Sequence, residues 1–404
     1  MKTIPNKNII RNHYLEKVRP FYNKQLIKIL TGQRRVGKSR VLLQIESELR
    51  KQFPKGNFIF IDKEKFEFDN IQNYKDLMFF VEGKSQGNRL NYLFIDEIQE
   101  IKDFEKALRS LLSDGNYDIY CTGSNAHIFS SQIATYLGGR QIEICIHSLS
   151  YIEYMDFHNL SNSEENLFTY LRYGGLPYLI HLPKNEKVIN EYLINVLSTI
   201  LYRDVIGRNQ IRDVAFLNNL LKFAADNTGS LLSARNISNY LKSQKSSKSV
   251  SVIVNYLNFL IDANLIHRSP RMDIQGMKLF EAGEKYYFED LGLRHAIIGY
   301  KAQDINKVIE NAVYNQLVFS GYNVFTGKTG QKEIDFIAQK ENERIYVQVA
   351  YKLADEKVIK REFGNLENIK DHYPKYVVSM DNFPITTSHK GIKHLNLSDF
   401  LLSM

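Results

Sequence analysis

The chain has 404 residues, more than a single hydrophobic core usually serves, so its length predicts two to four domains. Hydrophobic residues make up 44% and charged residues 24% of the sequence, which excludes a largely disordered or fibrous protein. Two cysteines, Cys121 and Cys145, are too few for a disulfide framework or a zinc cluster. The formal net charge of +8 suits an acidic partner such as nucleic acid, and it is equally well explained by solubility.

The sequence shows no signal-peptide stretch and no apolar run long enough to cross a bilayer. We therefore expect a cytoplasmic protein with no membrane partner.

A phosphate-binding pattern follows an apolar run of strand character at residues 25–31. Residues 32–39 complete the pattern G-x-x-x-x-G-K-S, and helical spacing continues from Arg40. In such a P-loop, backbone N–H groups turn toward the phosphates, the lysine reaches the β- and γ-phosphates, and the serine ligates Mg²⁺. The sequence therefore predicts bound ATP and Mg²⁺, with contacts from Gly32, Gln33, Arg34, Arg35, Val36, Gly37, Lys38, Ser39 and Arg40.

A second apolar run, residues 92–95, ends in Asp96 and Glu97. Two carboxylates at the end of a strand, downstream of a P-loop, can divide two tasks. Ser39 is expected to ligate Mg²⁺ and Asp96 to hold it in the outer shell. Glu97 is expected to act as the catalytic base that polarises the attacking water, with Lys38 stabilising charge on the phosphates.

Three further polar residues are candidates for this site. Ser124 and Asn125 follow the apolar run 117–121 and could sense the γ-phosphate, although Ser and Asn are also common in turns for local reasons. Arg140 precedes another strand-like run. It could act as an arginine finger, in cis or, within a homo-oligomer, in trans, or it could simply be a solvent-exposed side chain.

These motifs resemble the additional-strand branch of P-loop ATPases, and their order up to Arg140 resembles an AAA-type core. The whole chain resembles a prokaryotic family of predicted AAA-type ATPases with a C-terminal domain of unknown function. In this resemblance, residues 174–177 match the element by which a helical lid touches nucleotide, which makes Pro177 a candidate nucleotide contact. The alternative is an ordinary turn that ends a helix. The lack of an Asn-Lys-x-Asp motif argues against GTP.

Residues 213–282 show three helical segments followed by a β-ribbon pattern, the order of a winged helix-turn-helix. Between residues 231 and 280 there are seven basic and two acidic residues. This excess favours contact with DNA phosphates. A winged helix can equally dock a protein partner.

The last segment resembles the restriction-endonuclease-like fold, whose catalysis needs a strand Asp and then a carboxylate, one spacer and a Lys on the next strand. Asp335 supplies the first group, but Gln348 and Ala350 stand at the other two positions. We therefore expect a domain that does not cleave DNA. Lys352 or Glu310 taking over the missing roles is the alternative.

The predicted architecture is thus an α/β P-loop core at residues 1–150, a helical lid at 151–212, a winged helix at 213–282, and a nuclease-like α/β domain at 283–404. The predicted function is Mg²⁺-dependent ATP hydrolysis coupled to rearrangement of the C-terminal domains. A slow nucleotide-dependent switch for a protein partner, or a DNA-acting nuclease-type factor, are the alternatives.

Overall fold

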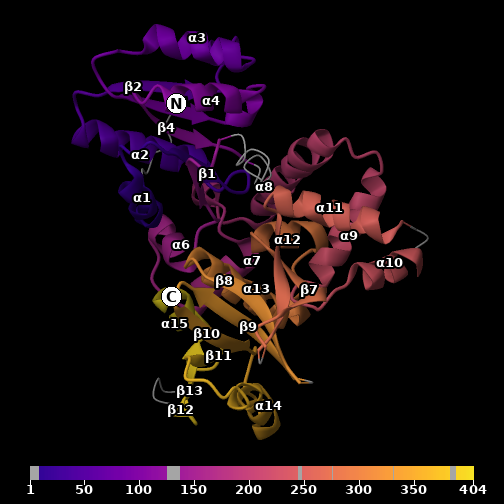
Figure 1. Ribbon diagram of the computed structural model, residues 1–404. Helices are drawn as coiled ribbons and strands as arrows, with labels where there is room; N and C mark the ends of the chain where they lie inside the picture. The colour runs from indigo at the N-terminus through magenta and orange to yellow at the C-terminus, as the bar shows by residue number, and fades with distance from the viewer. Residues whose placement is uncertain (1–8, 125–136, 244–247, 275, 331, 383–387) are drawn as a thin grey trace. The chain divides into compact units, whose positions relative to one another are not determined.

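The computed structural model describes residues 9–124, 137–243, 248–274, 276–330, 332–382 and 388–404. The chain divides into two compact units (Figure 1). The first comprises Met1–His147 with Asp262–Asn264, and the second comprises Ser148–Ile261 with Leu265–Met404.

The described part of the first unit contains a five-stranded sheet with the strand order β2-β3-β4-β1-β5, in which every neighbouring pair is parallel. All residues of β1, β3 and β4 are buried, as expected for the inner strands of a parallel sheet. Strand β4 lies between β1 and β3, the arrangement that the additional-strand resemblance implies. The strands are β1 (Ile27–Thr31), β2 (Asn57–Asp62), β3 (Asn91–Asp96), β4 (Tyr117–Thr122) and β5 (Gln141–Cys145).

Helices pack on this sheet. Helix α2 contacts β1, β3 and β4, while α4 contacts β4 and α3. Because the strands are parallel, the residues that follow β1, β3 and β4 lie along one edge of the sheet. The helices are α1 (Asn12–Val18), α2 (Lys38–Gln52), α3 (Tyr74–Lys84) and α4 (Phe104–Ser113), with 3₁₀ turns η1 (Arg19–Phe21), η2 (Phe66–Phe68) and η3 (Ile98–Glu100).

The second unit begins with a helical region. Ser150 starts its first helix with a capping box, in which its side chain accepts from the backbone of Glu153 and the Glu153 side chain accepts in return. The segments are α6 (Tyr151–His158), α7 (Glu164–Tyr173), the 3₁₀ turn η5 (Pro177–His181), α8 (Glu186–Thr199), the π-helical η6 (Ile200–Gly207), α9 (Val214–Asp226), α10 (Ala234–Ser243) and α11 (Val250–Asp262).

An eight-stranded mixed sheet follows, with the order β12-β13-β11-β10-β9-β8-β6-β7. The hairpin of β6 and β7 is part of this sheet, because β6 pairs in parallel with β8 from Arg271↔Thr326 to Asp273↔Lys328. The strands are β6 (Ile266–Asp273), β7 (Leu279–Phe288), β8 (Asn323–Thr329), β9 (Lys332–Lys340), β10 (Glu343–Val349), β11 (Lys375–Ser379), β12 (Ser388–His389) and β13 (Ile392–Asn396).

Alternating residues of this sheet enter two separate hydrophobic clusters. Phe336 and Val347 pack with residues of α13 and α15, whereas Ile337 and Tyr346 pack with residues of α14. Helices therefore cover both faces, as the period of two along a strand requires. The helices are α12 (Leu291–Ile298), α13 (Ile305–Phe319), α14 (Glu356–Glu367) and α15 (Leu397–Ser403), with the 3₁₀ turn η7 (Ala302–Asp304).

The predicted parallel α/β core is present in the first unit. The predicted boundary at residue 282 falls inside β7, so the expected wing and the expected nuclease-like segment share one sheet. The winged-helix and restriction-endonuclease-like assignments stay predictions. No helix in the described ranges has the length and apolar character needed to cross a membrane.

Candidate functional site

The P-loop connects β1 to α2 and is shaped by two glycines. Gly32 has φ +131°, and a Cβ there would lie 2.1 Å from the carbonyl oxygen of Ile146. Gly37 precedes α2 in the left-handed conformation. Neither position suits another residue type. The first turn of α2 carries no acidic side chain, so its N–H groups present an uncompensated positive dipole end to an anion.

The predicted P-loop contacts differ in burial. Gln33, Arg34, Val36 and Lys38 are buried, whereas the side chains of Arg35 and Arg40 are exposed. The ammonium group of Lys38 donates to the carbonyl oxygens of Gly32 and Gln33, each at 3.0 Å. The side chain of Lys38 therefore folds back over the start of the loop.

Ser39 and Asp96, the two predicted Mg²⁺ ligands, come together at the carboxyl edge of the sheet. The hydroxyl of Ser39 hydrogen-bonds to the Asp96 carboxylate, and the hydroxyl of Thr122 donates to Asp96 Oδ1 at 2.5 Å. Burial raises the pKa of Asp96, while these hydroxyl donors act in the opposite direction. A hydroxyl beside a buried carboxylate is an oxygen donor set that fits Mg²⁺, and the positive charge of the cation would offset the cost of burying the ionised carboxylate.

Glu97 follows Asp96 with a left-handed backbone, φ 56° and ψ 53°. Its N–H donates to Thr122 Oγ1 at 2.9 Å, and its carboxylate accepts from the amide of Gln99. The side chain is 6% exposed. The Thr122 hydroxyl thus contacts both Asp96 and Glu97.

The remaining candidates of the first unit fall in different places. Ser124 is buried near this edge, and its hydroxyl lies 3.4 Å from Gln99 Nε2. Asn125 lies outside the described residues. Arg140 precedes β5, where its carbonyl oxygen accepts from Ile27 at the start of β1. Because β1 and β5 are parallel and Ile27 pairs with Gln141, Arg140 lies beside Leu26, six residues before Gly32, so its backbone is about 20 Å from the P-loop along the strands. This position argues against an arginine finger in cis, and a role in trans stays a prediction.

Residues 174–177, matched to a lid element, are held within the second unit by Asp290. A Cβ on Gly174 would lie 2.3 Å from Asp290 Oδ1, and the N–H of Gly175 donates to Asp290 Oδ2 at 2.8 Å. The same carboxylate accepts from Leu293 at the start of α12. Burial raises the pKa of Asp290 to about 6. These contacts explain the two glycines structurally, and a nucleotide contact by Pro177 stays a prediction.

Arg11 is a residue of the P-loop surroundings that the sequence did not reveal. It is 3% exposed, and its guanidinium donates to the carbonyl oxygens of Val36, at 2.9 Å, and His147, at 3.0 Å. Arg11 thereby ties the loop to the residues after β5. An isolated arginine near an amino terminus carries no motif that could have indicated this role.

The second unit contains a polar pocket of about 650 Å³ beside β9, β10, α13 and α14. Lys285 from β7 stands among three carboxylates there. Its ammonium lies 2.9 Å from Glu310, 2.9 Å from Glu333 and 3.4 Å from Asp335. Gln348 accepts from the backbone N–H of Asp335 at 3.3 Å.

Asp335, Glu310, Gln348 and Lys352, the residues named from the sequence, all line this pocket, and Lys285 contacts its carboxylates. Burial raises the pKa of Glu310 to about 7, with Lys285 opposing the shift. For Lys285, burial acts to lower the pKa, but the three carboxylates outweigh it and the pKa is raised. The ammonium is thus a permanent counter-ion at the point where the carboxylates converge.

Two of the seven basic residues between positions 231 and 280 lie beside carboxylates. Lys248 pairs with Asp213 at 2.7 Å, and Arg268 lies 3.7 Å from Glu284. Helix α11 contains no Lys or Arg, and it exposes Val250 by 44%. These contacts weaken the argument for DNA phosphate binding.

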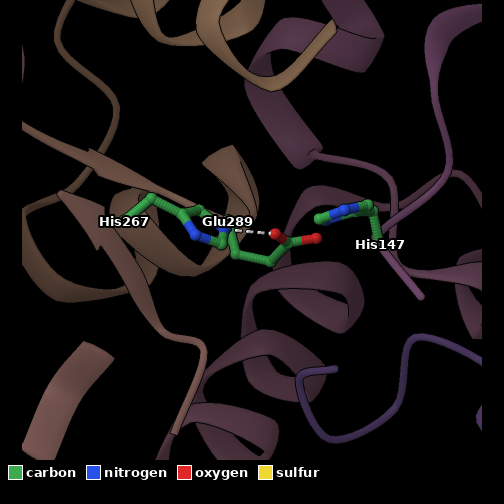
Figure 2. A group of neighbouring side chains, drawn as sticks. All are labelled: His147, His267 and Glu289. Atoms are coloured by element: carbon green, nitrogen blue, oxygen red, sulfur yellow. Dashed lines mark hydrogen bonds and ion pairs between the residues drawn. The ribbon is translucent and has the colours of Figure 1, made fainter. Parts of the chain in front are cut away.

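Figure 2 shows that the ring of His267, from β6, faces the carboxylate of Glu289, with Nε2 and Oε2 2.5 Å apart. The other oxygen of Glu289 accepts from the N–H of Ser148 at 2.7 Å. The pair therefore anchors β6 and β7 to the segment that leads into α6.

In the first unit, a P-loop follows β1 of a parallel sheet, and β4 lies between β1 and β3. This fold is that of a P-loop nucleotide-binding domain. A family model described as an AAA domain matches residues 24–155, and a domain of unknown function, DUF8612, matches residues 164–304. An uncharacterised protein of Haemophilus influenzae is 33% identical over 400 residues, 98% of each chain. The chain belongs to the same family as that protein.

Other likenesses are more distant. The uncharacterised protein MJ1544 of Methanocaldococcus jannaschii is 29% identical over 392 residues, 92% of this chain and 85% of that protein. Among solved structures, the Aeropyrum pernix ORC2 protein in ADPNP and ADP complexes has a TM-score of 0.37 at 11% identity, covering 76% of this chain and 92% of that one. A likeness at that level supports no argument about function.

Proposed function

We propose that this protein binds and hydrolyses ATP with Mg²⁺ and uses the nucleotide state to rearrange its C-terminal domains. The observation that carries the proposal is the convergence of Ser39, Asp96 and Glu97 next to the P-loop. The Ser39 hydroxyl bonds to Asp96, and the Thr122 hydroxyl bonds to both Asp96 and Glu97. Lys38 lies against the same loop. Mg²⁺ supplies charge neutralisation on the phosphates when bound. Ser39 and Asp96 would hold it, Lys38 would hold the phosphates, and Glu97 would accept the proton of the attacking water.

Lys38→Ala tests the binding step. The variant should lose ATP affinity by about 10²-fold or more, because charge-assisted contacts with phosphate each contribute about 1.5–3 kcal/mol. Isothermal calorimetry with ATP and Mg²⁺ measures the change. Lys51→Ala, at the exposed far end of α2, is the matched control and should bind as the wild type does. Unchanged affinity in Lys38→Ala contradicts the assignment.

For the helical segment of the second unit, a protein partner is favoured over DNA. Helix α11 has no basic residue and exposes Val250 and Val254, while Lys248 is already paired. We infer that this segment transmits the nucleotide state by docking a protein. Fluorescence anisotropy with a labelled duplex at 150 mM salt should show no saturable binding, and saturable binding at that salt would restore the DNA alternative.

The C-terminal pocket is proposed to be structural or partner-binding and not nucleolytic. The ammonium of Lys285 fills the point between Glu310, Glu333 and Asp335 that a catalytic metal would need. Supercoiled and linear DNA incubated with the protein and Mg²⁺ or Mn²⁺ should stay intact on a gel. Cleavage that disappears in Asp335→Asn would overturn this part of the proposal.

A further inference from the structure

Gln99 has a position that none of the P-loop motifs explains. It lies in the 3₁₀ turn η3, immediately after Glu97. The left-handed backbone of Glu97, unusual for a residue with a Cβ, costs about 1–2 kcal/mol and leads from β3 into the turn. As a result the amide of Gln99 lies against the carboxylate of Glu97, and Gln99 Nε2 donates to Glu97 Oε2.

The orientation of this amide follows from its partners. A carboxylate accepts hydrogen bonds and cannot donate them when ionised, so the NH₂ end of Gln99 must face Glu97. The same nitrogen lies 3.4 Å from the hydroxyl oxygen of Ser124, which follows β4. Gln99 thus connects the end of β3 to the end of β4.

The other end of the amide is buried and unsatisfied. Gln99 Oε1 is shielded from solvent and has no hydrogen-bond partner in the part of the chain that the structure describes. Leaving a buried acceptor unpaired costs about 1–3 kcal/mol, so such atoms usually serve a water or a ligand. Here the unpaired acceptor belongs to the same side chain that holds the candidate base.

We propose that Gln99 is a positioning residue for ATP hydrolysis, holding Glu97 with its nitrogen and accepting a hydrogen bond from the attacking water with its oxygen. The inference rests on the proposed ATPase function. A water between Gln99 Oε1 and Glu97 would have both of its hydrogens directed to acceptors, which leaves an oxygen lone pair for the γ-phosphorus.

Gln99 is chemically unchanged when ATP is hydrolysed. The water oxygen bonds to the γ-phosphorus, the bond from that phosphorus to the β–γ bridging oxygen breaks, and ADP leaves with the bond's electron pair. One water proton goes to the Glu97 carboxylate. Gln99 neither gains nor loses a proton, so it acts on rate through geometry alone.

Gln99→Met tests the proposal, because methionine keeps the volume and removes both polar atoms. We expect kcat to fall about 10- to 100-fold, the scale of one charge-assisted hydrogen bond, while ATP affinity stays within about twofold. Gln52→Ala, an exposed glutamine at the far end of α2, is the control and should keep the wild-type kcat.

Gln99→Glu is the second variant if Gln99→Met does not fold, since it keeps the shape and replaces the donor by an acceptor. It should also lower kcat at unchanged ATP affinity. Wild-type kcat in either folded variant overturns the role of Gln99, as does a loss confined to ATP affinity. A wild-type protein that binds no ATP overturns the proposed function itself, so the two failures are distinguishable.

Discussion

Thr122 contacts both acidic residues at the end of β3, Asp96 and Glu97, through a single hydroxyl. It accepts from the N–H of Glu97 and donates to the carboxylate of Asp96. A hydroxyl is suited to this position because it is donor and acceptor at once. The backbone turn that aims Glu97 and the orientation of Asp96 therefore depend on the same side chain.

Thr122→Val should separate these contacts from packing. Valine keeps the shape, but it leaves a buried N–H and a buried carboxylate without their partner, so the free energy of unfolding should fall by about 1–3 kcal/mol. The rate of ATP hydrolysis should fall with it, because both acidic side chains lose their orientation. Denaturant unfolding and phosphate release measure the two effects. Thr122→Ser keeps the hydroxyl and should retain most of the activity, and equal losses in Ser and Val variants would contradict this account.

At the scale of secondary-structure elements, Lys285 joins β7 to α13 and β9. Its three carboxylate partners come from two elements, Glu310 from α13 and Glu333 and Asp335 from β9. Tyr287, two residues further on β7, also donates to Glu310, at 2.7 Å. A lysine that is 3% exposed among these groups holds the elements together by charge.

Lys285→Ala should reduce the free energy of unfolding by about 3–5 kcal/mol at pH 8, because it leaves buried carboxylates without a counter-ion. The loss should be smaller at pH 5.5. The folded-state pKa of Glu310, about 7, is above its unfolded value, so the stability contributed by its protonation is present in acid and is lost as the pH rises through 7.

Urea unfolding at the two pH values measures the difference for Lys285→Ala. Lys352→Ala, an exposed lysine at the same pocket, is the control and should change stability by less than about 0.5 kcal/mol. A loss that does not depend on pH would show that Lys285 acts by packing and not by charge.

At the scale of the whole molecule, the sequence predicted where residues of contiguous motifs lie in the fold. The P-loop and the pair Asp96 and Glu97 depend on residues that are close in the chain and follow strands. Their convergence at one edge therefore followed from the parallel order of the strands. The helical spacing after Lys38 was equally local, and α2 begins at that residue.

Contacts between residues far apart in the sequence could not be predicted in this way. Lys285 reaches Asp335 across 50 residues, and Arg11 reaches Val36 and His147 without any local motif. Arg140 was a candidate arginine finger, in cis or in trans, because of its order in the chain, and the register of β1 and β5 places its backbone at the edge of the sheet opposite the P-loop. Strand pairing decides such positions, and a single sequence does not record it.

The central claim is that the carboxyl edge of the first unit hydrolyses ATP with Glu97 as the base. The most direct measurement is steady-state phosphate release with Mg²⁺ for the wild type and Glu97→Gln, alongside ATP affinity for both. We predict that the wild type turns over ATP. Glu97→Gln should bind ATP as tightly but release phosphate at least about 10²-fold more slowly, the scale of losing a positioned general base. Phosphate release by Glu97→Gln at the wild-type rate would contradict the account.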